Sequence, residues 1–529
     1  MRSHRLPGFV ALAALLLAAC GSGEGRPMYA TGQTPVLTVA IGVDPDTLDP
    51  MRTTTTTVQN IVQMVVQSLA RVDEAGKVQP SLARDWQQTP DALSWVFALR
   101  SGITFTDGVP LDAAAVKANL DRTFDPRSVC PTCGPLPRAV RSVDVVDPLN
   151  VKLTLSLPLA ADVVLGLLST ATYGIQSPAG IQKGTPGYAQ QEQPVGTGPY
   201  VLKERVKGDR VTLRRNDRHW GPRPAFAAQL FKIVPDATTR EALVRSGQAQ
   251  VILLPPISDL PSLRRDPTVR VLLAPGDRSV FFAINTVDKQ QPLLQNPQVR
   301  QALNIAVNRE AIVKSTLFGA AEPATSPLAP SLFGYCPVPN PYRYDPDLAR
   351  SMLQKANASG LTLDVVAPTG RYMQDFQAAQ NVANDFRAIG VNVNGPRTMD
   401  WPTYVSTINV PPSSATTDLH MLGFAPQFLD ASQAMLQFDS GQIPPKGQAT
   451  SYYDNPAVTA MLQRAQVEPN RDVRAQLYCS AQKQVWNDAP WVFLWIQKLP
   501  IVHSALVTGI GSFPNESFYT VDARPARAT

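Results

Sequence analysis

Cysteine is the residue type in this chain with the clearest capacity for covalent chemistry. The sequence contains five cysteines, and the four beyond the N-terminal segment are Cys130, Cys133, Cys336 and Cys479. An even number in an exported chain favours disulfides, and four cysteines allow three pairings. The segment Cys130-Pro131-Thr132-Cys133 could close a tight local ring, which would leave the other two as a long-range bridge. A redox-active pair is the alternative, but nothing near this segment resembles a strand leading into a helix, so we predict structural disulfides.

The histidines are too scattered to form a metal site or a catalytic set. There are only four, His4, His219, His420 and His503, and no two are close in the sequence. The spacings typical of zinc sites and the Gly-x-Ser-x-Gly elbow of serine hydrolases are both missing from the sequence. We therefore predict that the chain is not an enzyme and carries no metal and no cofactor.

The N-terminus has the features of an export signal. A basic start is followed by the apolar stretch Val10–Ala19, which is far shorter than the ~20 residues that a membrane-spanning helix needs. Cys20 then directly follows small residues, and this arrangement resembles the lipobox of bacterial lipoproteins. That resemblance implies a signal peptide over 1–19, lipidation of Cys20, and a small, polar tether over 20–35 that holds the protein on the extracytoplasmic face of a membrane. A short membrane anchor with an incidental cysteine is the alternative.

Composition excludes several other classes. The net charge is modest, since 48 Lys and Arg against 42 Asp and Glu give +6. No basic run suited to nucleic acid is present, so we expect no nucleic-acid partner. The 529 residues are enough for about three domain-sized units, and the apolar content of 44% is ordinary for folded domains.

Hydrophobic periodicity alternates between strand and helix along the whole chain. Val36–Val43 and the apolar Trp491–Ile496 have strand character, whereas Val58–Leu69 and Phe376–Ile389 place apolar residues on one helical face. Gly390 directly follows the longer helix, where a helix C-cap is expected. This alternation predicts an α/β architecture.

Five sequence motifs follow one another along the chain. They are Phe105-Thr106-Asp107-Gly108-Val109-Pro110-Leu111-Asp112-Ala113, Pro194-Val195-Gly196-Thr197-Gly198-Pro199-Tyr200, Val299-Arg300-Gln301-Ala302-Leu303-Asn304-Ile305-Ala306 with Asn308-Arg309-Glu310, Tyr344-Asp345-Pro346-Asp347-Leu348-Ala349, and Asp488-Ala489-Pro490-Trp491. In this order they resemble the motifs of one family, the large solute-binding proteins of peptide and nickel ABC transporters (family 5). Any one of them alone would be weak, and their order makes the resemblance specific.

The resemblance implies a two-lobe periplasmic-binding-protein fold, class II-like and of the large cluster-C type, with an extra subdomain in lobe I. In that fold two lobes close over a ligand like a hinge. The implied boundaries are 36–82 for the first part of lobe I, 83–190 for the extra subdomain, 191–285 for the second part of lobe I, 286–490 for lobe II, and 491–529 for the return to lobe I and the C-terminal tail.

Two segments map by resemblance onto the walls of the cleft. Thr54, Thr55 and Thr56 offer hydroxyl donors and acceptors, although a β-prone loop is the alternative. Trp401, in a segment that also holds Tyr404, resembles a cleft tryptophan of lobe II, with an ordinary buried aromatic as the alternative.

A third segment, which begins at Gly423 and Phe424, resembles the stretch that contacts the ligand in the family. Gln427 stands where oligopeptide binders carry an aspartate that pairs with the peptide amine, and a carboxamide supplies no charge for that role. Asp430 is the predicted substitute, and the alternative for Asp430 is the N-cap of a helix over 432–438.

We therefore predict a monomeric lipoprotein that binds a peptide or peptide-like ligand and delivers it to the permease of an ABC importer. A glycoside, an opine or a metal chelate is the alternative ligand class. A ligand-sensing lipoprotein without a transport role and a hydrolase are the alternatives in other classes.

Overall fold

A computed structural model describes residues 35–45, 47–52, 55–128, 130, 132–181, 193–339, 341–399 and 401–526. The predicted signal peptide, the predicted lipidation site Cys20 and Thr54 lie outside these residues. Among the helices within them, none combines the length and the apolar character needed to cross a membrane.

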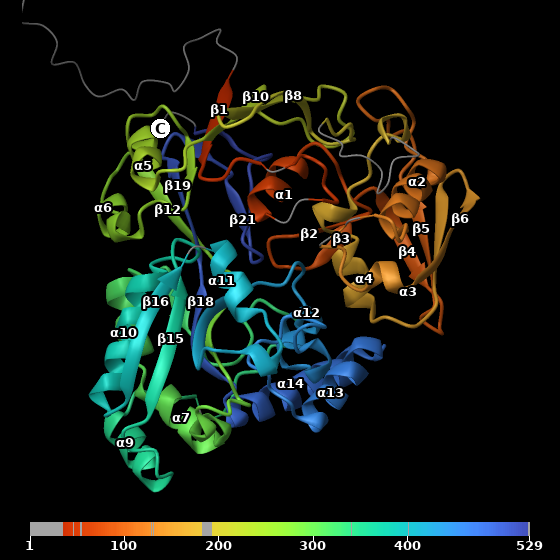
Figure 1. The fold of residues 1–529 in the computed structure, drawn as a ribbon. Coiled ribbons are helices and arrows are strands. Elements are labelled where there is room, and N and C mark those ends of the chain that lie inside the picture. Colours follow the sequence, from red (N-terminus) through yellow and green to blue (C-terminus); the bar gives the residue numbers. More distant parts are fainter. Residues whose placement is uncertain are drawn as a thin grey trace, which may run out of the picture.

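The first of three large sheets forms the core of lobe I. It has seven strands in the order β12-β19-β11-β1-β10-β9-β8, and β1 lies in its centre, parallel to both of its neighbours. Helices α1 (Thr56–Val62), α5 (Ala237–Arg245) and α6 (Leu260–Leu263) belong to the same lobe (Figure 1). The strands are β1 (Val36–Ile41), β8 (Tyr200–Val206), β9 (Arg210–Arg215), β10 (Ala228–Ile233), β11 (Val251–Leu253), β12 (Val269–Ala274) and β19 (Leu499–Ser504).

An antiparallel four-stranded sheet forms the extra subdomain at one side of lobe I (Figure 1). Its order is β4-β5-β7-β6, and it shares a core with three helices. A buried ion pair between Asp49 and Arg122 fastens this subdomain to the chain that follows β1. Its elements are β4 (Ala83–Gln88), β5 (Ser94–Leu99), α2 (Ala113–Phe124), α3 (Leu136–Ala139), β6 (Val140–Asp147), β7 (Asn150–Leu155) and α4 (Ala161–Leu167).

Lobe II is built on a six-stranded sheet in the order β14-β18-β13-β17-β15-β16, with helices around it (Figure 1). Two adjacent strands near its middle, β13 and β18, are almost entirely apolar because both of their faces are covered. The strands are β13 (Ser279–Ile284), β14 (Ala321–Pro323), β15 (Thr362–Pro368), β16 (Asn392–Met399), β17 (Leu419–Phe424) and β18 (Trp491–Gln497). The main helices are α7 (Pro297–Ala306), α9 (Pro346–Lys355), α10 (Asp375–Ala388), α11 (Trp401–Ile408), α12 (Ala431–Ala434), α13 (Pro456–Val467) and α14 (Arg471–Asp488).

Two short crossings join the lobes. The chain passes from β12 in lobe I to β13 in lobe II, and it returns from β18 to β19 through Lys498. The crossings touch, since a Cβ on Gly276 would lie only 2.0 Å from the carbonyl oxygen of Gln497. Gly276 therefore allows an approach that a larger residue would prevent.

The predicted α/β class is confirmed, but some elements differ from the sequence prediction. The helix expected over 58–69 ends at Val62. The lobe boundaries expected at 286 and 491 lie instead near residues 275–278 and at Lys498, because β13 and β18 both pair within the lobe II sheet. Apolar periodicity identifies a buried strand but does not reveal which sheet it joins.

Two disulfides connect the four cysteines. Cys130 pairs with Cys133 across a separation of three residues, within the subdomain. Cys336 pairs with Cys479, which ties a loop of lobe II to helix α14.

Candidate functional site

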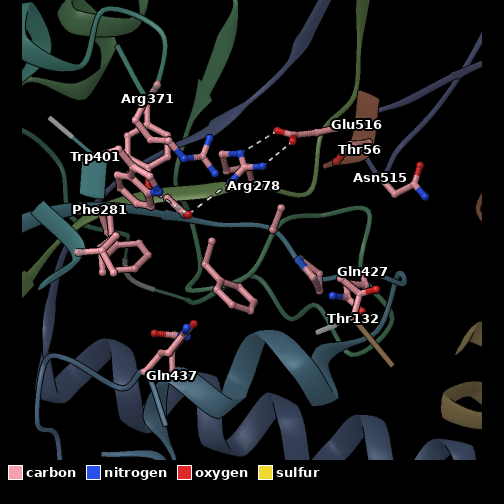
Figure 2. Close-up of a pocket in the computed structure, with 18 of the residues that line it drawn as sticks. Thr56, Thr132, Arg278, Phe281, Arg371, Trp401, Gln427, Gln437, Asn515 and Glu516 are labelled. Atoms are coloured by element: carbon pink, nitrogen blue, oxygen red, sulfur yellow. Dashed lines mark hydrogen bonds and ion pairs between the residues drawn. The ribbon is translucent and has the colours of Figure 1, made fainter. Parts of the chain in front are cut away.

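A cavity of about 310 Å³ lies where the two lobes meet. Figure 2 shows Arg371 and Trp401 at one side of it and Gln427 with Thr132 at the other. Lobe I, its subdomain and its C-terminal segment contribute polar groups, whereas lobe II contributes most of the aromatic and apolar wall. The lining residues used below are Thr56, Gln59, Thr132, Asn515, Glu516 and Ser517 from lobe I, and Arg278, Arg371, Tyr372, Trp401, Gly423, Phe424, Gln427 and Thr450 from lobe II.

The structure brings five of the predicted ligand residues to this cavity, namely Thr56, Trp401, Gly423, Phe424 and Gln427. Three of them, Gly423, Phe424 and Gln427, lie at or just beyond the carboxyl end of β17, so a single strand end presents them together. Close packing explains why a glycine stands at position 423, since a Cβ on Gly423 would lie only 2.8 Å from the ring of Tyr372.

Two other predicted residues support the wall instead of lining it. Thr55 is the N-cap of α1, where its hydroxyl accepts from the backbone N–H of Val58 at 3.4 Å. Tyr404 is completely buried; its hydroxyl donates to the carbonyl of Met421 at 2.6 Å, and its ring stacks on Trp401 with centroids 5.8 Å apart. Tyr404 thereby holds the tryptophan in place against β17.

Asp430 does not reach the cavity, and this corrects its predicted role as a partner for a ligand amine. Its carboxylate is buried and binds both terminal nitrogens of the buried Arg474, one of them at 2.7 Å. It also accepts from the N–H of Ser432 at 2.8 Å as the N-cap of α12, which was the alternative. A carboxylate with these partners has no free oxygen to offer a ligand, so we do not propose it as a contact.

The sequence prediction missed an ion pair that spans the two lobes. Arg278 stands at the start of lobe II, and its Nε and Nη2 donate to the two carboxylate oxygens of Glu516 at 3.0 and 2.6 Å. Burial disfavours the charge of Arg278, but Glu516 outweighs that effect and raises the pKa of the guanidinium above its usual value. The neighbouring Asp277 is buried, and burial together with Glu516 raises the pKa of its carboxyl well above the usual range. The signal that could have indicated this site is the pair of charges directly before an apolar strand.

Arg371 was also missed, and its environment is different. It lies in a loop after β15, and its guanidinium carbon lies 5.0 Å from the ring centre of Trp401 and 5.1 Å from that of Tyr372. Within the described ranges, no hydrogen bond or ion pair engages its side chain. Desolvation in the cleft lowers the pKa of this guanidinium from its usual value. The carboxylates of Glu516 and Asp375 favour the charge of Arg371 from a distance, but neither bonds to its side chain. Among the described residues, Arg371 is therefore a cation held on aromatic faces without a direct ion-pair partner.

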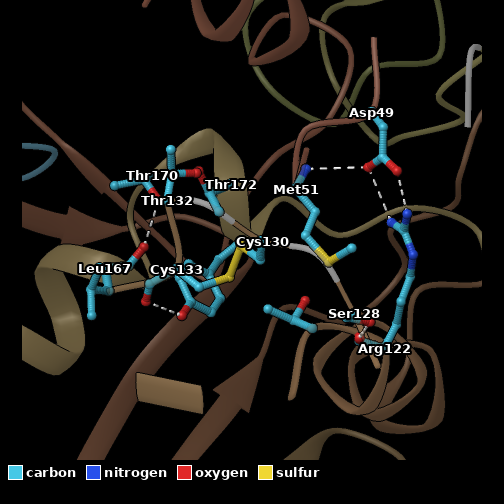
Figure 3. Close-up of a disulfide and its surroundings, with 12 residues drawn as sticks. Asp49, Met51, Arg122, Ser128, Cys130, Thr132, Cys133, Leu167, Thr170 and Thr172 are labelled. Carbon is cyan, nitrogen blue, oxygen red and sulfur yellow. Dashed lines mark hydrogen bonds and ion pairs between the residues drawn. A yellow bond between two sulfur atoms is a disulfide. The ribbon is translucent and has the colours of Figure 1, made fainter. Parts of the chain in front are cut away.

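The local disulfide positions a cavity residue. Thr132 lies between Cys130 and Cys133, and its hydroxyl is 3.0 Å from that of Thr172 (Figure 3). The carbonyl of Cys133 in turn accepts from the buried hydroxyl of Tyr173 at 2.7 Å. The disulfide thus fixes Thr132 at the edge of the cavity.

Directly after Gln427, the loop of lobe II enters lobe I. Phe428 is 4% exposed and belongs to the core of the extra subdomain, where a Cβ on Gly166 would lie 2.9 Å from its ring. Polar contacts flank this site, since Arg471 of α14 lies 3.0 Å from the carboxylate of Asp162 in α4. The residue that reaches the cavity and the residue that joins the lobes are therefore adjacent in the chain.

No cluster of potential metal ligands occurs in the part of the chain that the structure describes. His420 contacts the cavity lining, since its Nε2 lies 2.7 Å from the hydroxyl of the lining residue Thr450. Burial lowers the pKa of this imidazole to about 3, so it is neutral. The cavity can therefore bind through hydroxyls, carboxamides, aromatic faces and one free guanidinium.

Comparison with known families agrees with this arrangement. Residues 77–445 match the family described as bacterial extracellular solute-binding proteins, family 5. The chain is 29% identical over 489 residues to the glutathione-binding protein GsiB of Escherichia coli O6:K15:H31, an alignment that covers 92% of this chain and 93% of that protein.

Solved structures share the fold. NikA from Brucella suis, in complex with Fe(III)-EDTA, superposes with a TM-score of 0.82 at 23% identity, covering 93% of this chain and all of that one. A dipeptide-binding protein from Pseudoalteromonas sp. SM9913, in complex with Met-Leu, gives 0.77 at 24% identity over the same shares. These similarities confirm the predicted two-lobe fold.

Proposed function

The chain belongs to the bacterial extracellular solute-binding proteins of family 5, and from this premise we propose that it captures a peptide-like ligand bearing a carboxylate. The ligand lies in the cavity between the lobes, and the closed protein delivers it to the permease of an ABC importer. The relative named as glutathione-binding and the fold neighbour solved with a dipeptide support this ligand class.

One observation carries the proposal, and it is the guanidinium of Arg371. An arginine that lies on two aromatic rings and has no direct ion-pair partner among the described residues is suited to a planar anion. A ligand carboxylate can accept two parallel N–H bonds from it, and such charge-assisted pairs are among the strongest in proteins. Arg278 does not compete for this role because Glu516 already engages it.

The remaining lining groups suit the body of a peptide-like molecule. Phe424 and Trp401 offer apolar surface, while Thr56 and Gln59 offer groups that can bond to amides. The matched family and the listed relatives are binding proteins, so in this proposal the ligand is bound and released without reaction.

In this proposal the protein acts as a monomer on the extracytoplasmic face of a membrane. Residues 1–19 direct export, and Cys20 carries the lipid that anchors the chain. The segment 20–35 is the tether that lets the folded part meet the permease.

A non-peptide acid, such as a metal chelate or an opine, is the second candidate. The neighbour solved with Fe(III)-EDTA shows that this fold accepts a polycarboxylate chelate. The Arg371 guanidinium would bind either class, whereas apolar contact with Trp401 and Phe424 favours the peptide-like one.

Native mass spectrometry of the gently purified protein, compared with a refolded sample, tests the proposal. We expect a bound small molecule that carries a carboxylate and is lost on refolding. Calorimetric titration of that molecule, or of glutathione and dipeptides, should show about tenfold or greater weakening in Arg371→Gln, because a charged hydrogen bond contributes about 1.5–3 kcal/mol. Arg350→Gln, at an exposed arginine of α9, is the matched control and should bind as the wild type does. A neutral sugar as the bound molecule would overturn the proposal.

A further inference from the structure

A second and larger cavity adjoins the first one. It measures about 630 Å³ and lies between lobe I and the lobe II loop over 427–429. On the lobe I side it is bordered by α1, by the hairpin of β2 (Ala70–Val72) and β3 (Val78–Pro80), and by the loop that holds Trp220. The two cavities share four lining residues, namely Gln59, Gln427, Asn515 and Ser517. The boundary between them is therefore made of polar side chains and is not a packed apolar wall.

Gln427 is the lobe II residue at this boundary. Its backbone N–H donates to Oε1 of Gln433 at 2.6 Å, which fixes the backbone. The side-chain Oε1 of Gln427 is buried and has no hydrogen-bond partner among the residues described. A buried acceptor without a partner costs free energy that a donor from a ligand would recover.

Charge at the two ends of the first cavity is unequal. Arg371 lies at one side and Gln427 at the other, as Figure 2 shows. Glu516 is the only acidic residue among the described lining of the first cavity, and Arg278 occupies both of its oxygens. A ligand whose carboxylate meets Arg371 thus finds no free carboxylate for an ammonium group near Gln427. The far end of the ligand is not fixed there by charge.

The second cavity offers surfaces suited to a continuing chain. Its lining carries carboxamide and hydroxyl groups, among them Gln63, Gln67 and Ser68. The lining also includes carboxylates: that of Asp73 already accepts three hydrogen bonds, and those of Glu74 and Asp522 belong to exposed residues. Trp220 is 39% exposed, and its Nε1 donates to Oε1 of Gln67 at 2.8 Å. The guanidinium of Arg100 lies 5.2 Å from the centre of this indole, so the ring is held as a platform. Carboxamide groups together with aromatic side chains suit peptide groups and a flat or apolar side chain of a ligand.

We infer that the ligand site extends past Gln427 into this second cavity, and that the protein accepts peptide-like acids of more than two residues or with a blocked amino end. The inference rests on the proposed function, because it takes the carboxylate end of the ligand to be at Arg371. It differs from that function in naming the class of ligand by its length and by the loss of any need for a free amine.

A titration series with a cavity-filling variant tests the inference. The probes are dialanine, tetra-alanine and N-acetyl-tetra-alanine, measured by calorimetry. Ala171→Trp places a large side chain in the second cavity, whereas Val146→Trp, at a position 58% exposed on β6, is the control. We expect the wild type and the control to bind both tetrapeptides at least as tightly as dialanine. We expect Ala171→Trp to weaken both tetrapeptides tenfold or more and to leave dialanine within about twofold.

The outcomes separate the inference from the function on which it rests. Wild-type protein that binds dialanine but rejects the longer probes would overturn the inference alone. Equal binding of tetrapeptides by Ala171→Trp and the control would do the same. Wild-type protein that binds none of the three would overturn the proposed peptide function and the inference together. Retained dialanine binding also shows that the variant is folded.

Discussion

Truncation of Phe428 to alanine should weaken ligand binding, although this side chain does not line the first cavity. Phe428 directly follows the cavity residue Gln427, and its ring lies in the core of the extra subdomain of lobe I. Lobe II supplies the residue and lobe I supplies its surroundings, so the contact exists only while the lobes are together. Any opening that separates them must expose the ring to water.

The size of the effect follows from the burial of the ring. Phe428 is 4% exposed, and replacement of a buried phenylalanine by alanine typically costs about 3–5 kcal/mol. We take the lower value, about 3 kcal/mol, because side chains around a contact between two lobes can move to fill part of the gap that the ring leaves. Since each 1.4 kcal/mol is tenfold in affinity, the ligand dissociation constant should rise by about a hundredfold.

Calorimetry with the ligand found by mass spectrometry measures the change, and small-angle scattering reports whether ligand still compacts the protein. Phe376→Ala is the matched control, since Phe376 lies in α10 of lobe II and is 39% exposed. We expect the control to bind as the wild type does. Unchanged affinity in Phe428→Ala, with a normal melting temperature, would refute the argument. It would mean that Phe428 stays in the subdomain when the cleft opens.

Three further predictions concern the supports of the site. Asp430→Asn should lower the melting temperature strongly, because breaking a buried ion pair costs about 3–5 kcal/mol, while calorimetry on the folded fraction should show ligand affinity within a few-fold of wild type. Joint replacement of Cys130 and Cys133 by serine should weaken ligand binding roughly fivefold by calorimetry, because Thr132 must then be ordered at a cost of about 1 kcal/mol. The pKa of His420 is about 3 in the folded protein, below its usual 6.5, so its contribution to the free energy of unfolding is complete above pH 6.5 and is lost as the pH falls towards 3. Thermal melts should show that the wild type loses about 2 kcal/mol of its free energy of unfolding by pH 5 and that His420→Gln loses less.

The sequence was sufficient to predict the architecture because that information is local. Alternating strands and amphipathic helices, with turn motifs between them, indicated an α/β chain, and the structure confirms it. The predicted boundaries between the lobes, in contrast, differ by several residues from the crossing points in the structure. The buried strands β13 and β18 are apolar on both faces, so their sequence carries no mark of the sheet to which they belong.

The candidate site was predictable only where one strand end presents several residues together. Gly423, Phe424 and Gln427 follow from the position of β17, and all three line the cavity. The ion pair of Arg278 and Glu516 joins residues that are 238 positions apart, and no local pattern connects them. Such a pair becomes visible only when the C-terminal segment returns beside the first crossing.

Asp430 shows why residue type alone could not assign the amine site, and why its true partner matters for ligand binding. A buried carboxylate near a cavity suits a ligand ammonium as well as it suits a protein guanidinium, and here Arg474 on α14 takes it. That pair fixes the C-terminal end of the loop to lobe II, while β17 fixes the N-terminal end at Gly423. Between these two fixed points Gln427 meets the cavity and Phe428 enters lobe I. A ligand that orders Gln427 therefore also places Phe428 for docking, so occupancy of the cavity and contact between the lobes stabilise each other.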